Sequence, residues 1–245
     1  MGVFSGQTNL WMYGTPNGKT YVAKNVVVQD SLLLNLDSTA SGSYSGSGNT
    51  WTDLSGQGNH GTINGATYTS AEDAFYFDGY NDRVGCGDIT GFNTNKLTLE
   101  AWVNVNSFTG NDGDTTGYII QGGDSSLDFD LQTIKSGSTN KFNFRIGSTS
   151  NISSGSVSTD TWYHLLATYD GSSMEFYLNN SSVGTNSSTR TFQNTRNVEL
   201  GRYTFATENA FQYDGYLSVV RIYNDVLTSD EREQNFDAYR ERFGV

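Results

Sequence analysis

Residues 50–82 read TWTDLSGQGNHGTINGATYTSAEDAFYFDGYND and contain two polar loops joined by a short aromatic stretch. The first loop, Asp53–Gly61, is rich in glycine, and the second, Asp78–Asp82, directly follows Phe75–Phe77. Glycine adopts positive φ without steric cost, so both segments predict tight turns. Their Asp and Asn side chains supply hard oxygen atoms, which are the ligands that calcium prefers. Ordinary polar turns have the same composition, so the stretch is compatible both with a calcium site and with two turns that bind no ion.

The composition favours a β-rich chain that does not bind nucleic acid, and the length fits either one large all-β domain or two ordinary ones. The chain has 245 residues, a net charge of -12, 28 glycines and 13% aromatic residues. An acidic chain has no basic stripe to displace the counterions of nucleic acid or of anionic membranes, so neither is expected as a partner. No apolar run approaches the ~20 residues of a membrane span and no secretion signal is evident, which predicts synthesis in a cytoplasm. The lone Cys86 cannot form an intrachain disulfide and is expected to be a buried apolar residue.

Alternating apolar residues predict strands along most of the chain. Apolar and polar residues alternate over 97–105, 142–146 and 174–178, and polar turn clusters separate these segments. Val26–Val28 and Leu32–Leu36 are apolar runs of strand length. This spacing predicts an all-β fold in which two antiparallel sheets form a sandwich.

One helix is predicted, at the C-terminus. Thr228 and Glu231 form a capping box, and Phe236, Tyr239 and Phe243 fall on one helical face. Gly244 is placed to end the helix. We expect this short C-terminal helix to pack across the sandwich.

Several motifs resemble laminin-G-like domains of the concanavalin A-like lectin/glucanase superfamily. They are the DLSGQGNHGT loop at 53–62, FDGYNDRV at 77–84, TWYHLLATYDG at 161–171, NVELGR at 197–202 and DGYLSVVRIYN at 214–224. With the entrance motif SLLLNLD at 31–37, the resemblance covers residues 31–245, and it is to domains found in tailed bacteriophage and marine bacterial proteins. The chain departs from this pattern at Ser218, where many relatives carry an acidic residue. It departs again at Tyr177–Asn180, where relatives have a Tyr-x-Asp-Gly turn, so polar functions of those positions are not transferred.

The resemblance implies a jelly-roll sandwich over residues 26–245. Residues 1–25 are aromatic and irregular, and they contain the only proline, Pro16. We interpret them either as a hairpin packed on the main domain or as an arm that attaches it to a larger assembly, because exposed aromatics on such an arm need burial.

The resemblance also supports a structural calcium ion with Asp53, Asn59 and Asp78 as the first ligands. Asp82 is a second-rank ligand, as is Asp214, whose turn resembles a segment near the N-terminal loops of laminin-G-like folds. For carbohydrate, Trp51, Tyr44 and Tyr80 are the candidate exposed rings, whereas Trp102 and Trp162 are expected in the core.

Catalysis is not expected. Retaining glycosidases need two carboxylates about 5–5.5 Å apart, and glucanases resembling this chain use an E-x-D-x-E type of strand that is absent here. The D-x-D pair Asp128 and Asp130 is interpreted as solvated or of lectin type. His60 is expected to bond a backbone carbonyl in its turn, and His164 to be structural.

Three functions follow from the resemblance. The preferred one is a non-catalytic virion surface protein, a capsid decoration or fibre subunit, that carries a carbohydrate-binding domain and contacts virion proteins through residues 1–25. The alternative is a bacterial carbohydrate-binding or adhesion module at the cell surface, and a glycoside hydrolase is the third. A homo-oligomer is compatible with the first two.

Overall fold

The computed structural model describes residues 26–245 except 94, 111–112, 124–127 and 204–209. The predicted arm, residues 1–25, lies outside the described residues.

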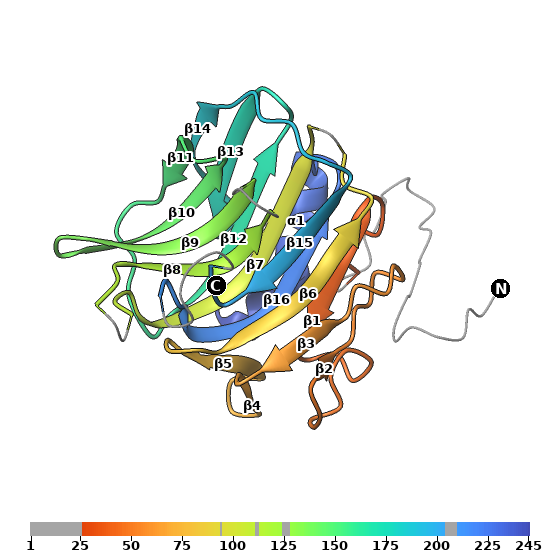
Figure 1. The fold of residues 1–245 in the computed structure, drawn as a ribbon, viewed down its shortest axis with the longest axis vertical. Helices are drawn as coiled ribbons and strands as arrows, with labels where there is room; N and C mark the ends of the chain where they lie inside the picture. The colour runs from red at the N-terminus through yellow and green to blue at the C-terminus, as the bar shows by residue number, and fades with distance from the viewer. Residues whose placement is uncertain (1–25, 94, 111–112, 124–127, 204–209) are drawn as a thin grey trace, which may run out of the picture.

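Sheet A contains eight strands. From one edge they are β14 (Ser181–Ser187), β13 (Ser173–Leu178), β12 (Trp162–Tyr169), β7 (Leu97–Ser107), β16 (Asp214–Tyr223), β5 (Ala74–Asp78) and β4 (Thr67–Thr69), with β1 (Leu32–Asp37) also paired to β16. Figure 1 shows these long strands crossing the molecule side by side.

Sheet B also contains eight strands. Their order is β11 (Ser150–Ser153), β10 (Thr139–Ile146), β9 (Phe129–Ser136), β8 (Thr116–Gly122), β15 (Thr195–Leu200), β6 (Arg83–Thr90), β3 (Gly61–Asn64) and β2 (Thr50–Trp51). Neighbouring strands pair antiparallel in both sheets. The predicted all-β, two-sheet jelly-roll sandwich with a short C-terminal helix is therefore confirmed.

The core lies between the sheets. Leu99 and Ala101 of sheet A and Leu131 and Phe144 of sheet B are fully buried in one apolar cluster. Their polar neighbours in sequence point away from it, because successive side chains of a strand face opposite sides. The outer faces therefore carry polar side chains, except where Trp102 and Val219 of sheet A lie in an apolar cluster with Phe236 and Phe243.

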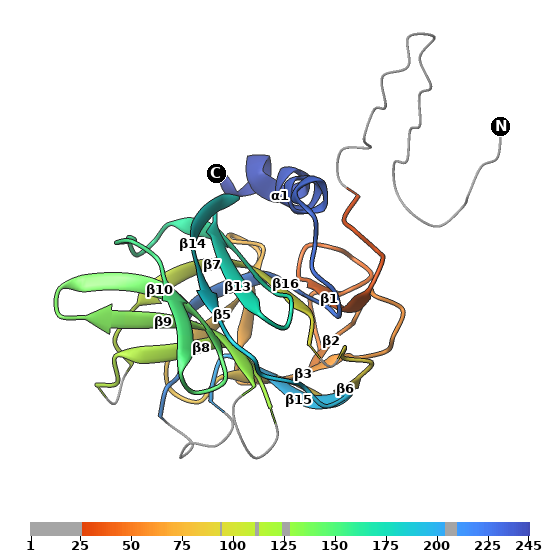
Figure 2. The ribbon, with the colours of Figure 1, turned by 90° about the horizontal axis from the view of Figure 1, so that it is seen from above.

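Helix α1 (Ser229–Phe243) covers the outer face of sheet A (Figure 2). Its capping box is formed as predicted, and the C-cap Gly244 is left-handed with φ 70°. Trp102 on β7 stacks on Phe243, with ring centroids 4.5 Å apart, and on Phe236 at 5.8 Å. No helix in the described part of the chain is long and apolar enough to cross a membrane.

The prediction of a strand at Val26–Val28 is wrong. These residues form no strand and lie beneath α1 instead. Asn235 accepts a hydrogen bond from the Val28 amide at 2.9 Å, and Gln234 donates to the Val26 carbonyl at 2.7 Å. Side chains of the helix thus satisfy backbone groups that a neighbouring strand would otherwise satisfy.

Candidate functional site

The first predicted loop is organised by Asp53 itself. This carboxylate is 6% exposed and accepts four hydrogen bonds, from the amides of Asn35 (2.9 Å), Ser55 (2.8 Å) and Asn59 (3.0 Å) and from the Ser55 hydroxyl (2.7 Å). Among the described residues, the predicted hydrogen bond from His60 to a backbone carbonyl is not seen; His60 Nδ1 instead accepts from the Asp53 amide at 3.1 Å. Each Asp53 oxygen already has two donors, so a calcium ion would have to displace them.

In the second predicted loop, Asp78 lies beside Asp82 and across from Asp214. Asp78 on β5 pairs in register with Asp214 on β16, and a Cβ on Gly79 would lie 2.8 Å from the Cβ of Asp214. Asp82 accepts a hydrogen bond from the Asp78 amide at 3.0 Å. Burial, together with the neighbouring charge of Asp78, raises the pKa of Asp214 to about 6, although a hydrogen bond with Tyr76 opposes the shift.

The two loops do not form one site. They lie at opposite ends of strand β3. Near the first loop, Trp51 pairs with Gly61 at the start of β3. Near the second loop, Asn64 at the end of β3 pairs with Arg83, the residue after Asp82. Asp53 and Asn59 are therefore not brought together with Asp78, as one shared ion would require. Across the described residues, no three or more His, Cys, Asp or Glu side chains are arranged to hold a metal ion.

The predicted sugar-contacting rings differ in exposure. Trp51 is fully buried, so the expectation that it is exposed is wrong; its ring packs against Phe75 with centroids 4.6 Å apart. Tyr44 is partly buried and also packs edge-on against Phe75, at 4.8 Å. Only Tyr80, 47% exposed, presents its ring to solvent as predicted.

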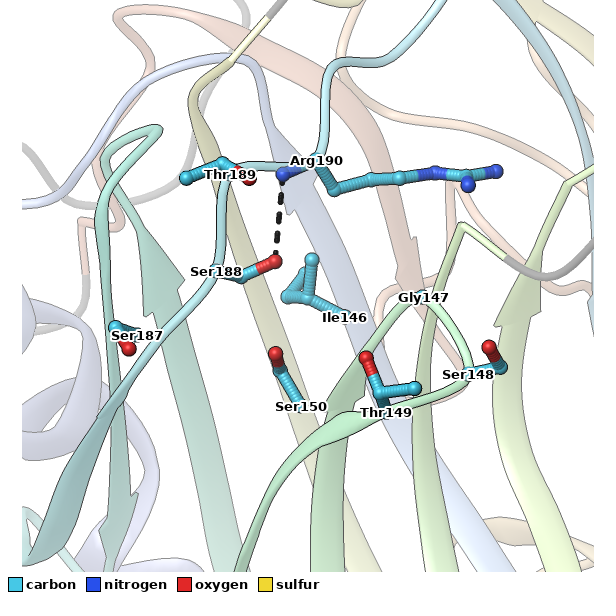
Figure 3. A pocket seen from close by; sticks show the side chains of 9 residues that line it. All are labelled: Ile146, Gly147, Ser148, Thr149, Ser150, Ser187, Ser188, Thr189 and Arg190. Carbon is cyan, nitrogen blue, oxygen red and sulfur yellow. Dashed lines mark hydrogen bonds between the residues drawn. The ribbon is translucent and has the colours of Figure 1, made fainter.

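A pocket of about 460 Å³ lies elsewhere, between the β10–β11 turn and the segment that follows β14 (Figure 3). Buried Ile146 lies between the two segments, and Arg190 completes the lining. Six hydroxyl-bearing side chains make up most of the rest: Ser148, Thr149, Ser150, Ser187, Ser188 and Thr189. A hydroxyl both donates and accepts, so this lining matches a polyhydroxylated ligand.

Hydrogen bonds from neighbouring strands hold the pocket in shape. The hydroxyl of buried Tyr169 on β12 donates toward the carbonyls of Ser188 (3.2 Å) and Arg190 (2.7 Å). Asn186 at the end of β14 donates to the Asn151 carbonyl on β11 at 2.8 Å, which joins the two walls. The walls are therefore formed before any ligand arrives, which reduces the entropy lost on binding.

Arg190 is fixed by a buried carboxylate. Its Nε and Nη2 donate to Asp128 Oδ1 at 2.9 and 2.5 Å, and Arg196 also contacts Asp128. The arginine chain passes over Gly147, where a Cβ would lie 3.9 Å from its Cδ (Figure 3). Asp128 is 2% exposed and Asp130 is fully buried, so the interpretation of this D-x-D pair as solvated is wrong.

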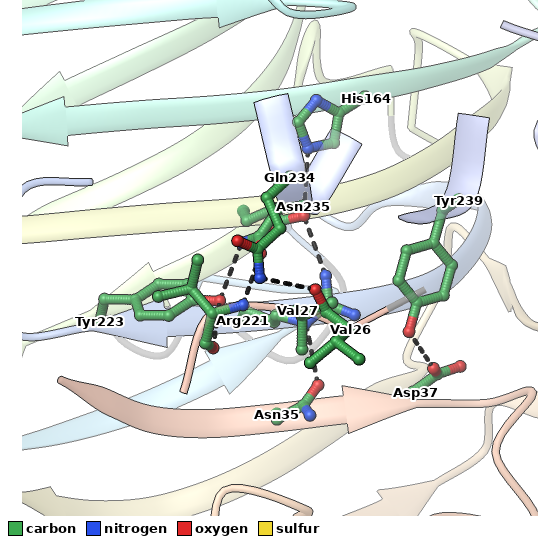
Figure 4. A network of polar contacts seen from close by, with 12 residues as sticks. Val26, Val27, Asn35, Asp37, His164, Arg221, Tyr223, Gln234, Asn235 and Tyr239 are labelled. Carbon is green, nitrogen blue, oxygen red and sulfur yellow. Dashed lines mark hydrogen bonds and ion pairs between the residues drawn. The ribbon is translucent and has the colours of Figure 1, made fainter. Parts of the chain in front are cut away.

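A second polar network lies under α1 (Figure 4). Glu100 Oε1 accepts from Arg221 at 2.9 Å and lies 3.2 Å from His164 Nε2, while its Oε2 accepts from Asn235 at 2.7 Å. All four residues are fully buried. His164 has the expected structural environment, and this network holds the helix rather than a ligand.

The fold is similar to that of carbohydrate-active and toxin proteins. Trypanosoma rangeli sialidase in complex with sialic acid matches with TM-score 0.67 and 15% identity over 96% of this chain and 36% of the sialidase. Domain 4 of AbnA, a GH43 extracellular arabinanase from Geobacillus stearothermophilus, in complex with arabinotriose, matches with TM-score 0.60 and 15% identity over 84% of this chain and 98% of the domain. The botulinum neurotoxin serotype D/C binding domain matches with TM-score 0.61 and 14% identity over 86% of this chain and 52% of that domain.

The chain spans only about a third of the sialidase, and at these identities the likeness concerns the fold. Comparison with curated protein sequences finds no match. A family model described as the concanavalin A-like lectin/glucanases superfamily matches residues 78–231, well over half of the chain. This chain belongs to the concanavalin A-like lectin/glucanases superfamily.

Proposed function

We propose that this protein binds carbohydrate without altering it, and that the hydroxyl-lined pocket beside Arg190 is the binding site. The observation that carries this proposal is the set of six Ser and Thr side chains around Ile146. The family of the chain and the saccharide complexes among its structural neighbours support the ligand class.

The pocket suits a sugar for two physical reasons. Its volume of about 460 Å³ lies within the range of small-ligand pockets, roughly 300–1,000 Å³. Each hydrogen bond between a protein hydroxyl and a sugar hydroxyl replaces bonds to water, so it contributes only about 0.5–1.5 kcal/mol to the binding free energy. Several such bonds must therefore form together. A short saccharide reaches several of these groups at once, whereas a simple alcohol reaches one or two.

The lining supports binding without catalysis. In the part of the chain that the structure describes, no Asp, Glu, His or Cys lines this pocket. Glycoside hydrolysis uses two carboxyl groups that flank the bond to be broken. Asp128 is the carboxylate bonded to Arg190, and it is buried and shared with Arg196.

We propose a virion surface, as a capsid decoration or fibre subunit attached through residues 1–25, as the setting for this activity. The support is the sequence resemblance to bacteriophage domains. A bacterial cell-surface adhesion module is the alternative, and detection of the protein in purified particles separates the two.

We also propose that a structural calcium ion is bound by Asp78, Asp82 and Asp214 rather than by Asp53 and Asn59. As they stand, these three described carboxylates do not form a metal site, so binding would require their side chains to reorient. The register pairing of Asp78 with Asp214 and the hydrogen bond from the Asp78 amide to Asp82 support this choice, and the four hydrogen bonds that Asp53 already accepts argue against the other pair. Loop carbonyls and water would have to complete the coordination shell.

A glycan array tests the proposed function. The whole chain is applied in calcium and again with chelator, after circular dichroism has shown that it is folded in both. We expect binding to one glycan class. Binding that needs calcium would add a role for the Asp78 region, and a folded protein that binds no glycan would contradict the proposal.

A further inference from the structure

One edge of strand β1 is not paired with a strand. Among the described residues, β1 pairs antiparallel with β16 and with no other strand. In an antiparallel pair, the backbone groups of alternate residues point toward the partner strand and those of the residues between them point away. The groups of Leu33, Asn35 and Asp37 point away from β16 and form what we call the outer edge of β1. A strand edge that is left open can bind a further strand.

A loop, residues 53–59, covers the middle of the outer edge. The Asn35 amide donates to Asp53 Oδ1 at 2.9 Å, and the Asn35 carbonyl accepts from the Leu54 amide at 2.8 Å. The Asp53 carboxylate therefore replaces the carbonyl of a neighbouring strand, and the Leu54 amide replaces its N–H group. Asn35 and Asp53 are both 6% exposed, so the contact is shielded from water.

Side chains also satisfy the groups on either side of this centre. The Leu33 carbonyl accepts from Asn59 Nδ2 at 2.7 Å and from Ser55 Oγ at 3.2 Å. The Asp37 amide donates to Ser43 Oγ at 3.2 Å. The outer edge is therefore satisfied by a loop and by single side chains, in positions where a strand would supply a regular ladder.

The loop lies outside the core that holds the two sheets together. None of residues 53–60, all of which are described, belongs to the apolar clusters of the sandwich. Gly56, Gln57 and Gly58 at its tip are exposed. The polar contacts to β1 are thus the main attachment of the loop, and the outer edge opens when they are broken while the core stays packed.

We infer that the outer edge of β1 is a pairing surface for β1 of a second copy of this chain, and that the 53–59 loop keeps this surface closed. A two-fold axis beside Asn35 sets two β1 strands antiparallel, so that each Asn35 amide donates to the Asn35 carbonyl of the other copy. The same register sets each Asp37 amide opposite the Leu33 carbonyl of the other copy. Every one of these groups is bonded by a side chain or by the loop in the single chain, so the outer edge is complementary to itself.

The loop and a second copy compete for the same backbone groups. The loop belongs to the same chain and is therefore present at a high effective concentration, so it prevails while its contacts are intact. Weakening the loop should shift the balance toward pairing as protein concentration rises. This surface contains neither Arg190 nor any residue of the pocket, so the inference stands or falls independently of the proposed function.

The test opens the edge with Asp53→Ala, which removes the acceptor of the Asn35 amide. Asp170→Ala is the matched control, because Asp170 accepts three hydrogen bonds from Ser172 and Ser173 in a turn away from β1. Sedimentation velocity over a range of protein concentrations measures association. Hydrogen exchange followed by NMR measures protection of the Asn35 amide in the same samples.

We expect the Asn35 amide to exchange about tenfold faster in dilute Asp53→Ala than in the wild type, because one hydrogen bond is lost. As the concentration rises, Asp53→Ala should form dimers and its Asn35 exchange should slow again. In the wild type and in Asp170→Ala, exchange at Asn35 should not depend on concentration. The Ser38 amide, which donates to the Ser218 carbonyl on β16 at 2.9 Å, should stay protected in all three proteins and so reports that β1 is in place.

Ser55→Ala/Asn59→Ala removes both donors to the Leu33 carbonyl and leaves Asp53 unchanged, so it decides the matter where Asp53→Ala does not fold. It too should associate as concentration rises. Unchanged exchange at Asn35 in folded Asp53→Ala would overturn the role of the loop. Faster exchange without dimers, dimers that leave Asn35 unprotected, or equal association in Asp170→Ala would overturn the second copy as the partner, as would a monomeric Ser55→Ala/Asn59→Ala.

Discussion

Glu100 and Arg221 form an ion pair in which both side chains are fully buried, with Oε1 and Nη1 2.9 Å apart. The pair joins β7 to β16 on the outer face of sheet A, and Asn235 attaches α1 to it. Arg221 also donates to Asn35 on β1 at 3.1 Å. Strands β1 and β7, which are distant in sequence, therefore meet the consecutive elements β16 and α1 at one charged pair.

Glu100→Gln should destabilise the protein by about 3–5 kcal/mol, because it removes the carboxylate that is paired directly with the buried Arg221 guanidinium. Urea unfolding measures the loss. Asp237→Asn is the matched control, since its ion pair with Arg240 is about half exposed and contributes at most about 1 kcal/mol. Equal effects of the two substitutions would contradict a stabilising role for the buried pair.

The pH dependence of stability should also depend on Glu100. Burial alone would raise its pKa, but the Arg221 charge and hydrogen bonds from His164 and Asn235 hold the pKa below its ordinary 4.5. A carboxyl group with a lowered pKa stabilises the fold above its unfolded-state pKa and loses that effect as pH falls through the folded value. The stability difference between wild type and Glu100→Gln should therefore narrow below about pH 4.5. A difference that stays constant down to acid unfolding would sink this account.

Asp214 should have the opposite effect to Glu100 on the pH dependence of stability. Because its pKa is raised to about 6, the folded state binds the proton more tightly, and stability falls as pH rises from 3.8 to about 6. Asp214→Asn should remove this fall and stabilise the protein by about 1 kcal/mol at pH 8, after allowance for solvent screening. Thermal midpoints of both proteins at pH 4 and pH 8 give the comparison. A destabilised Asp214→Asn at pH 8 without calcium would refute the prediction.

Calcium should raise stability if it binds near Asp214. A ligand that binds only the folded state contributes RT ln(1 + [L]/Kd), about 2.7 kcal/mol at a hundredfold excess over Kd. We expect the thermal midpoint of the wild type to rise in calcium and that of Asp214→Asn to rise less. A wild-type midpoint that is the same in calcium and chelator would count against the ion.

The contact between α1 and the outer face of sheet A should contribute strongly to the free energy of unfolding. Phe236 on α1 is 7% exposed and stacks on Trp102, so Phe236→Ala should cost about 3–5 kcal/mol. Tyr80→Ala, at an exposed ring in a turn, should change stability little. Similar losses from both substitutions would show that α1 contributes no special stability.

The sequence predicts the sandwich well because alternation and capping are local signals. Strand β7 and the Thr228–Glu231 capping box formed where the residue pattern placed them. Val26–Val28 has the same apolar character as a strand, but the residues that cover it, Gln234 and Asn235, lie more than 200 positions away. Local patterns carry no information about such a partner.

The candidate site was harder to predict for the same reason. Its two walls, around Ser150 and Ser187, meet only because β11 and β14 contact each other at the sheet edges. In the sequence, Asn186-Ser187-Ser188 looks like an ordinary polar turn. The prediction for Trp51 failed because a tryptophan in a polar stretch suggested exposure, whereas the side chain lies in the apolar core against Phe75.

The most direct test of carbohydrate binding at the pocket compares two tryptophan substitutions on β14. Ser187 lines the pocket, whereas Thr185 is exposed two residues earlier on the same strand and does not. Affinity for the tightest glycan on the array is measured by calorimetry for the wild type, Ser187→Trp and Thr185→Trp. The account predicts at least a tenfold loss for Ser187→Trp and unchanged affinity for Thr185→Trp, while equal affinity in all three proteins would contradict it.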